Sequence, residues 1–157
     1  MEDKYSKIEW CCFQKNGIKI IEPNEIRGRS YLDAAYGDLI TMKSLALKIQ
    51  NSAAYDACYN SFYSILQKIG IKCELCDCTF EIFNLIPEFT EEQISLIKRL
   101  KNNLIEIEQQ HKRPKPVNEE PVIAFVATSS QVFDSLSSDK IRLIRKEIMQ
   151  FSKKRKK

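Results

Sequence analysis

The sequence predicts an all-α protein, an up-and-down bundle of antiparallel helices. Apolar residues recur at alternating intervals of three and four over most of the chain, which is the spacing of one helical face. Gly and Pro are scarce, with 4 and 5 among 157 residues, as is typical of a helix-rich globular protein. We find no internal repeat and no segment that convincingly predicts a sheet.

Size and composition indicate a globular protein of one domain. Hydrophobic residues make up 43% of the chain, and no run reaches the 18 apolar residues of a membrane span. The N-terminal stretch MEDKYSKIEW has acidic residues where a signal peptide has basic ones. We therefore expect a cytoplasmic protein that does not associate with membranes. In that compartment its 6 cysteines are expected to be reduced thiols or metal ligands.

The chain divides into four expected parts: a helical bundle over 1–111, a proline-rich linker over 112–121, a helical extension over 122–152 and a basic tail over 153–157. Charge is uneven among them. Residues 140–157 hold nine Lys or Arg against Glu147, a local +8, so the remainder carries −4 of the total +4. This asymmetry favours a polyanion or an acidic partner at the C-terminal end, although a solvated tail gives the same pattern.

Residues 3–15 predict a short amphipathic helix that ends at Asn16-Gly17, with Tyr5, Ile8, Cys11 and Cys12 on its inner face. The alternative is a hairpin with its turn at Asn16-Gly17, because an Asn-Gly pair serves both structures. Residues 18–23 are expected to be extended. A long helix then runs from the cap Asn24 to about Ile49. Its buried face is Gly28, Leu32, Ala35, Leu39, Met42, Ala46 and Ile49.

The segment Asn51–Gly70 predicts the helix at the centre of the bundle. One face carries large side chains, Tyr55, Tyr59, Phe62, Leu66 and Ile69, and a flank carries small ones, Ala53, Ala54, Ala57, Cys58 and Ser61. Small residues let a neighbouring helix approach closely, so this helix is expected to be buried. Its antiparallel partner is the preceding helix, across a connection of a few residues.

The second half of the chain predicts four more helices. A short one spans Thr79–Ile86 and stops at Pro87. Thr90 and Gln93 form a capping-box pattern that opens a helix to about Gln110, with His111 continuing its inner face of Ile94, Ile97, Leu100, Leu104 and Ile107. Pro121 suits the first position of the next helix. Ser137 or Ser138 caps the last one, whose inner face is Ile141, Ile144, Ile148 and Phe151.

Three phrases of the sequence together resemble the HEPN domain: GIKIIEPNE before a long helix, SAAYDACYNSFYSILQKIGIKCE, and the core helix after FTEEQ. The similarity covers about residues 5–111. Within that family, the chain is similar to the prokaryotic and archaeal proteins that contain a phrase of the type YYxxxYxxLxxxGIKCE. The resemblance implies a helical bundle that forms a homodimer. Many such domains are ribonucleases or toxins encoded beside a minimal nucleotidyltransferase, and others bind nucleotides or RNA without catalysis.

The sequence departs from the catalytic pattern of that family, an Arg separated from a following His by four to six intervening residues. The only histidine is His111, and the positions that would need Arg hold Leu104, Ile105 and Glu106. The absence of this Arg argues against a catalytic function. We expect a non-catalytic nucleotide- or RNA-associated module, or the partner of a minimal nucleotidyltransferase. A divergent HEPN ribonuclease toxin using His111 as general base and a small zinc-binding regulatory module remain alternatives.

The candidate nucleotide- or RNA-binding residues are Tyr55, Tyr59, Lys101, Asn102, His111, Lys112 and Arg113. The tyrosines also suit a core, and a His at a helix C-terminus also suits a cap. Cys73, Cys76 and Cys78 include a C-x2-C spacing, half of a zinc site, although buried thiols are the simpler interpretation. No cofactor is predicted.

Overall fold

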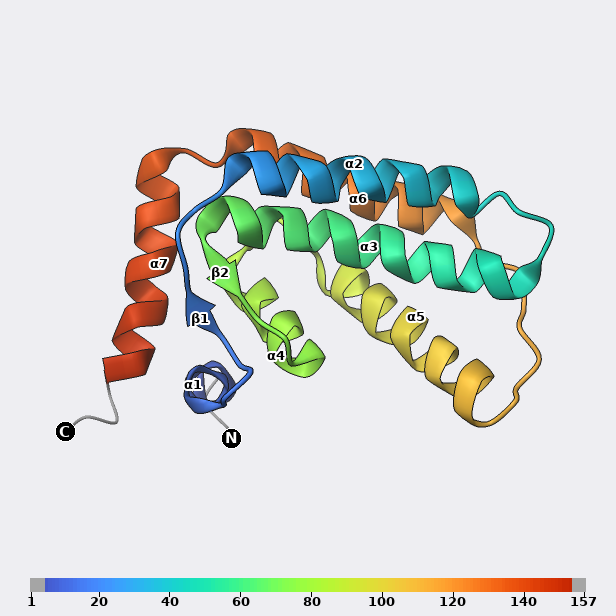
Figure 1. The fold of residues 1–157 in the computed structure, drawn as a ribbon, viewed down its shortest axis with the longest axis horizontal. Coiled ribbons are helices and arrows are strands. Elements are labelled where there is room, and N and C mark those ends of the chain that lie inside the picture. The colour runs from blue at the N-terminus through green and yellow to red at the C-terminus, as the bar shows by residue number, and fades with distance from the viewer. Residues whose placement is uncertain (1–4, 154–157) are drawn as a thin grey trace.

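The computed structural model describes residues 5–153, which form seven α-helices, one 3-10 helix and two short strands (Figure 1). The elements run in the order α1 (Ser6–Phe13), β1 (Lys19–Ile20), α2 (Glu25–Thr41), α3 (Leu47–Ile69), β2 (Ile71–Lys72), α4 (Cys76–Glu81), the 3-10 helix Ile82–Leu85, α5 (Glu91–Gln109), α6 (Glu119–Ser135) and α7 (Ser138–Lys153). The predicted all-α bundle is confirmed. None of the helices in residues 5–153 is long and apolar enough to cross a membrane.

The centre of the bundle is α3, as the sequence predicted. Helices α2, α5 and α6 lie alongside it, and α7 crosses its C-terminal end (Figure 1). Its small-residue flank is fully buried, and there the hydroxyl of Ser61 donates a hydrogen bond to that of Ser129 on α6 at 3.0 Å. Gly70 caps the helix in the left-handed conformation, with φ 91°.

The predicted C-terminal end of the long helix Asn24–Ile49 is wrong. Asn24 does cap α2, accepting a hydrogen bond from the amide of Arg27 at 2.8 Å, but the helix stops at Thr41. Residues 42–46 form the turn, and Ile49 lies in α3 with 47% of its surface exposed. The apolar spacing continued through this turn, so it did not mark the break.

At the N-terminal side, the helix prediction is confirmed and the hairpin alternative is wrong, within the described residues from Tyr5 onward. The expectation of no sheet is also wrong. Strands β1 and β2 pair antiparallel, with Lys19 opposite Lys72 and Ile20 opposite Ile71. The ladder is only two residues long, too short for period-two alternation to show in the sequence.

The segment between β2 and α5 holds an aromatic cluster. The predicted helix Thr79–Ile86 instead begins at Cys76 and continues as the 3-10 helix Ile82–Leu85. Phe83 stacks on Phe62 of α3 with ring centroids 3.8 Å apart, and Phe89 and Phe125 lie edge-on or tilted around them. The Thr90–Gln93 capping box is confirmed in both directions.

The last two helices extend the same core. Helix α6 begins at Glu119, two residues before the predicted Pro121, and packs against α3. Ser137 caps α7, since its hydroxyl accepts the amide of Lys140 at 3.1 Å. Helix α7 lies beside α1, where Tyr5 and Phe151 stack at 5.6 Å. Positions 154–157 of the predicted basic tail lie outside the described residues.

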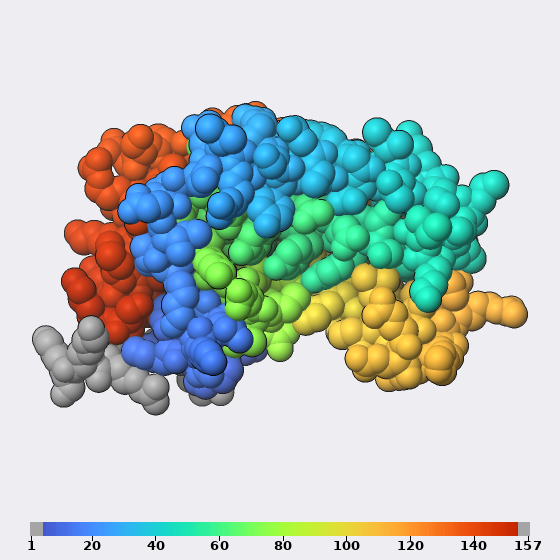
Figure 2. All heavy atoms as spheres, viewed as in Figure 1, coloured from blue at the N-terminus to red at the C-terminus, as the bar shows by residue number. Residues whose placement is uncertain are grey.

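Helices α1 and α7 lie at one end of the molecule, and the C-terminal end of α5 and the following linker lie at the other (Figures 1 and 2). Helix α5 diverges from α3 along its length. Its first half is buried at Leu96, Ile97 and Leu100, whereas no residue after Leu100 is fully buried. The C-terminal half of α5 is therefore available to line cavities.

Candidate functional site

A groove runs along α5 at the end of the molecule away from α1 and α7; we call it the linker groove. It consists of three adjoining cavities. The first, of about 130 Å³, shares three lining residues with the second, of about 170 Å³: Asn51, Asn103 and Lys115. The second shares three with the third, of about 680 Å³: Leu96, Arg99 and Pro121. The groove therefore extends from the end of α5 to the start of α6.

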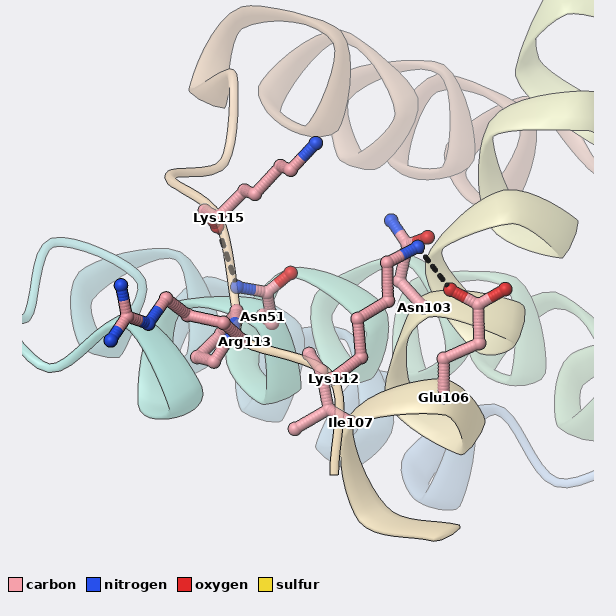
Figure 3. A pocket seen from close by; sticks show the side chains of 8 residues that line it. Asn51, Asn103, Glu106, Ile107, Lys112, Arg113 and Lys115 are labelled. Carbon is pink, nitrogen blue, oxygen red and sulfur yellow. Dashed lines mark hydrogen bonds and ion pairs between the residues drawn. The ribbon is translucent and has the colours of Figure 1, made fainter. Parts of the chain in front are cut away.

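The reversal of the chain after α5 shapes the first cavity. His111 adopts a left-handed conformation, with φ 53°, directly after the C-cap Gln110. This turns the chain so that the amide of Lys112 donates to the carbonyl of Glu106 at 3.2 Å. The ammonium of Lys112 also pairs with the Glu106 carboxylate at 2.6 Å (Figure 3). His111 thus has a backbone role and does not continue the inner face of α5.

Two amide side chains at the start of α3 hold the linker in place. The Nδ2 group of Asn51 donates to the carbonyls of Lys115 and Leu47, each at 2.8 Å (Figure 3). The amide of Val117 donates to Oε1 of Gln50 at 3.3 Å. Asn51 is only 5% exposed, so its contact with Lys115 is shielded from water. These bonds fix the linker as one wall of the groove.

The groove carries an excess of positive charge. Arg99, Arg113 and Lys115 are exposed, and residues 5–153 give none of them an ion-pair partner. Lys112 and Glu106 neutralise each other. The wide third cavity is less basic, because Glu91 and Glu92 line it beside Arg99. The positive potential is therefore concentrated in the first two cavities.

The second cavity combines two of these cations, Arg99 and Lys115, with an apolar wall. Leu96, Leu100 and Val122 are buried there, and Pro116 and Val117 of the linker face them across the cavity. Asn103 and Asn118 add polar groups that can both donate and accept hydrogen bonds. A concave site with an apolar wall, amides and cations is suited to a ligand that has an anionic and an apolar part.

The structure separates the binding residues predicted from the sequence. Lys112 and Arg113 line the linker groove. Lys101 and Asn102 lie on another side of α5, in a cavity of about 260 Å³ where Lys101 pairs with Asp77 at 3.6 Å. His111 is exposed and is not among the residues that line the groove.

Tyr55 and Tyr59 belong to a ladder of rings outside the groove. Tyr59 stacks on Tyr63 at 5.6 Å and on Tyr55 at 5.8 Å, and Tyr63 meets Tyr31 of α2 edge-on at 5.0 Å. Burial raises the pKa of Tyr59 to about 12 and also raises that of Tyr55. Both phenols are therefore neutral at physiological pH, and both rings contribute to packing outside the groove.

The expectation that the cysteines are reduced thiols or metal ligands is wrong for two of them. Cys11 of α1 and Cys78 of α4 form a disulfide across 67 positions, with a Cα–Cα distance of 5.6 Å. Cys78 therefore does not act as a thiolate ligand with Cys73 and Cys76. Within residues 5–153 no group of three or more His, Cys, Asp or Glu side chains is placed to hold a metal ion.

Sequence reasoning missed four groove residues: Asn51, Arg99, Asn103 and Lys115. Arg99 and Asn103 are four positions apart on α5 and so share a face, which was a readable signal. Asn51 was predicted to begin the central helix, whereas it lies inside α3, which begins at Leu47. Its partner Lys115 is 64 positions away, a contact that only the fold reveals.

Comparison with known proteins gives no relative for this chain: no family model, no curated protein and no solved structure matches it.

Proposed function

We propose that the linker groove binds a phosphate-bearing ligand, a nucleotide or single-stranded RNA, without catalysing a reaction on it. The observation that carries the proposal is the placement of Arg99, Arg113 and Lys115 around one groove without acidic partners among residues 5–153. Guanidinium groups suit phosphate because they present several N–H donors in a planar fork.

The second cavity supports a base as well as a phosphate. Its apolar wall of Leu96, Leu100 and Val117 offers a surface for a ring, and the amides of Asn103 and Asn118 reach hydrogen-bonding groups at a base edge. A nucleotide thus has its phosphate near the cations and its base against the wall.

A binding role fits the composition of the groove better than catalysis does. No histidine or cysteine lines its two basic cavities, and the acid that lines them, Glu106, is held by Lys112 in an ion pair. General acid–base chemistry requires a side chain free to exchange a proton with the substrate. The homodimer and the complex with a minimal nucleotidyltransferase, which the sequence resemblance implies, stay proposals without an assigned interface.

The test is equilibrium binding to a labelled single-stranded RNA of about ten nucleotides, followed by fluorescence anisotropy. The variant Arg99→Ala/Lys115→Ala should bind about tenfold more weakly or worse, since each charge-assisted contact is worth roughly 1.5 kcal/mol or more. The matched control is Arg27→Ala/Lys15→Ala, which removes the same charge from exposed residues outside the groove.

Competition with ATP distinguishes the two ligand classes. If a mononucleotide is the ligand, ATP displaces the RNA at concentrations near its own dissociation constant. If an RNA strand is the ligand, an unlabelled strand displaces it and ATP does not. Equal weakening by both double variants, or cleavage of the RNA during the assay, would contradict the proposal.

A further inference from the structure

Cys76 is the one free cysteine among residues 5–153 whose side chain is not buried. Cys12, Cys58 and Cys73 are all buried, and Cys11 and Cys78 are bonded to each other. Cys76 opens α4 and is partly exposed. Because oxidants in water react with accessible thiolates, Cys76 is the first free cysteine they meet.

A neighbouring phenol fixes the position of the Cys76 side chain. The hydroxyl oxygen of Tyr55 lies 3.3 Å from Sγ of Cys76. Burial raises the pKa of Tyr55, so the phenol keeps its proton and can donate a hydrogen bond to that sulfur.

A second thiol lies nearby in the chain and in space. Cys73 precedes Cys76 in a C-x2-C spacing, and its Sγ donates to the carbonyl of Leu75 at 3.3 Å, within the segment between the two cysteines. Cys73 is 2% exposed, and burial raises its pKa. Cys76 is among the groups whose charge acts on Cys73. Cys73 is therefore a shielded thiol placed beside an accessible one.

We propose that Cys76 is a site of oxidation by peroxide and that Cys73 resolves the product into an intramolecular disulfide. In the first step the Cys76 thiolate attacks one peroxide oxygen, the O–O bond breaks, and sulfenic acid forms with release of hydroxide. In the second step the sulfur of Cys73 attacks the sulfenic sulfur, the S–O bond breaks, and water leaves with the Cys73 proton. The two cysteines lose two electrons and one peroxide molecule is reduced.

The local structure gives this oxidation a consequence. Cys78 already joins α4 to α1. A Cys73–Cys76 bond would tie the start of α4 to the end of β2 as well, and it would withdraw the Cys76 thiol from Tyr55. Oxidation therefore changes the contact between α4 and the tyrosine ladder, while the Cys11–Cys78 bond persists.

The test uses the full chain, prepared so that the Cys11–Cys78 bond is intact, and treated with one equivalent of hydrogen peroxide. Alkylation, cleavage after Glu74 and mass spectrometry locate the bonds, because Glu74 lies between the two cysteines. The expected result is loss of two hydrogen atoms and a Cys73–Cys76 link that a reductant opens.

Three variants sharpen this assignment. Cys73→Ser should accumulate sulfenic acid at Cys76, detected as a several-fold gain in dimedone labelling over the unmodified chain. Tyr55→Phe keeps the ring but removes the hydroxyl, and should slow oxidation of Cys76 several-fold. Cys58→Ser, a buried thiol elsewhere on α3, should change neither result.

Locating the disulfide bonds in the unmodified chain tests the proposal even if a variant fails to fold. The inference is overturned if peroxide leaves Cys76 as a free thiol, if Cys76 proceeds to sulfinic acid with Cys73 still reduced, or if Cys76 becomes linked to Cys11, Cys12 or Cys78.

Discussion

The guanidinium of Arg145 on α7 lies 2.7 Å from the carbonyl oxygen of Ile21, the residue that follows β1. The same Nη1 atom lies 3.1 Å from the carbonyls of Ile69 and Gly70 at the end of α3. A cation is favourable at a helix C-terminus, where carbonyls lack intrahelical partners. One side chain thus joins α7, the central helix and the segment after the first strand.

Replacing Arg145 should therefore destabilise the fold. Arg145→Met keeps an apolar stem but leaves the carbonyls without their donor, and should lower the free energy of unfolding by about 2–3 kcal/mol. Urea denaturation measures the change. Arg142→Met is the control, because among residues 5–153 the one ion pair of exposed Arg142 is with Asp139 at 3.4 Å, and its loss should cost less than about 1 kcal/mol. Equal losses in the two variants would contradict this role of Arg145.

Two glycines of α2 should respond to alanine with opposite signs. A Cβ at Gly28 would lie 2.7 Å from the carbonyl oxygen of Ser64 and 2.8 Å from a ring carbon of Phe133, so Gly28→Ala should cost about 1–3 kcal/mol. A Cβ at Gly37 meets nothing within 4 Å, and Gly37→Ala should add about 0.5–1 kcal/mol. Thermal unfolding compares the two; a stabilised Gly28→Ala protein would show that α2 and α3 are less closely packed.

Reduction of the Cys11–Cys78 disulfide should weaken the fold without abolishing it. The bond closes a loop of 67 positions, which corresponds to about 4 kcal/mol of lost denatured-state entropy. The melting temperature should fall by a similar amount when a phosphine reductant is added and when Cys11→Ser removes the bond. If neither treatment changes the melting temperature, α1 and α4 are held by packing alone.

The stability contribution of Asp56 should depend on pH. Partial desolvation, together with the charge of Asp38, raises the pKa of Asp56, an exposed residue, above its ordinary 3.8. The carboxylate is thus disfavoured in the fold, so Asp56→Asn should raise the melting temperature slightly at pH 7. Below about pH 3.8 both states are protonated and the gain should vanish. A gain that is equal at pH 7 and about pH 3 would exclude ionisation as its cause.

The sequence predicted those parts of the fold that depend on local contacts. The Thr90–Gln93 capping box and the Asn24 cap each involve residues three positions apart. The central place of α3 followed from its all-round content of apolar and small residues. Periodicity did not locate the end of α2, because the turn at 42–46 contains no Gly or Pro and the apolar spacing runs through it.

The groove and the disulfide could not be predicted, because both depend on the relative placement of distant segments. Cys11 meets Cys78, and Asn51 meets Lys115, across more than 60 positions. Lys112 and Arg113, which the sequence offered as binding candidates, line the groove, whereas Arg99 was not among those candidates. The turn at His111, a non-Gly residue with positive φ, determines which side of α5 faces the linker. The sequence did not predict that turn.

The most direct test of the linker groove is the salt dependence of RNA binding. For the unmodified chain, the logarithm of the association constant should fall linearly with the logarithm of salt concentration. Arg99→Ala/Lys115→Ala should reduce that slope by about 1.4, two contacts at about 0.7 each for a single strand, and Arg27→Ala/Lys15→Ala should leave it unchanged. A slope that is the same in all three proteins would contradict the account, since the phosphates would then lie elsewhere on the molecule.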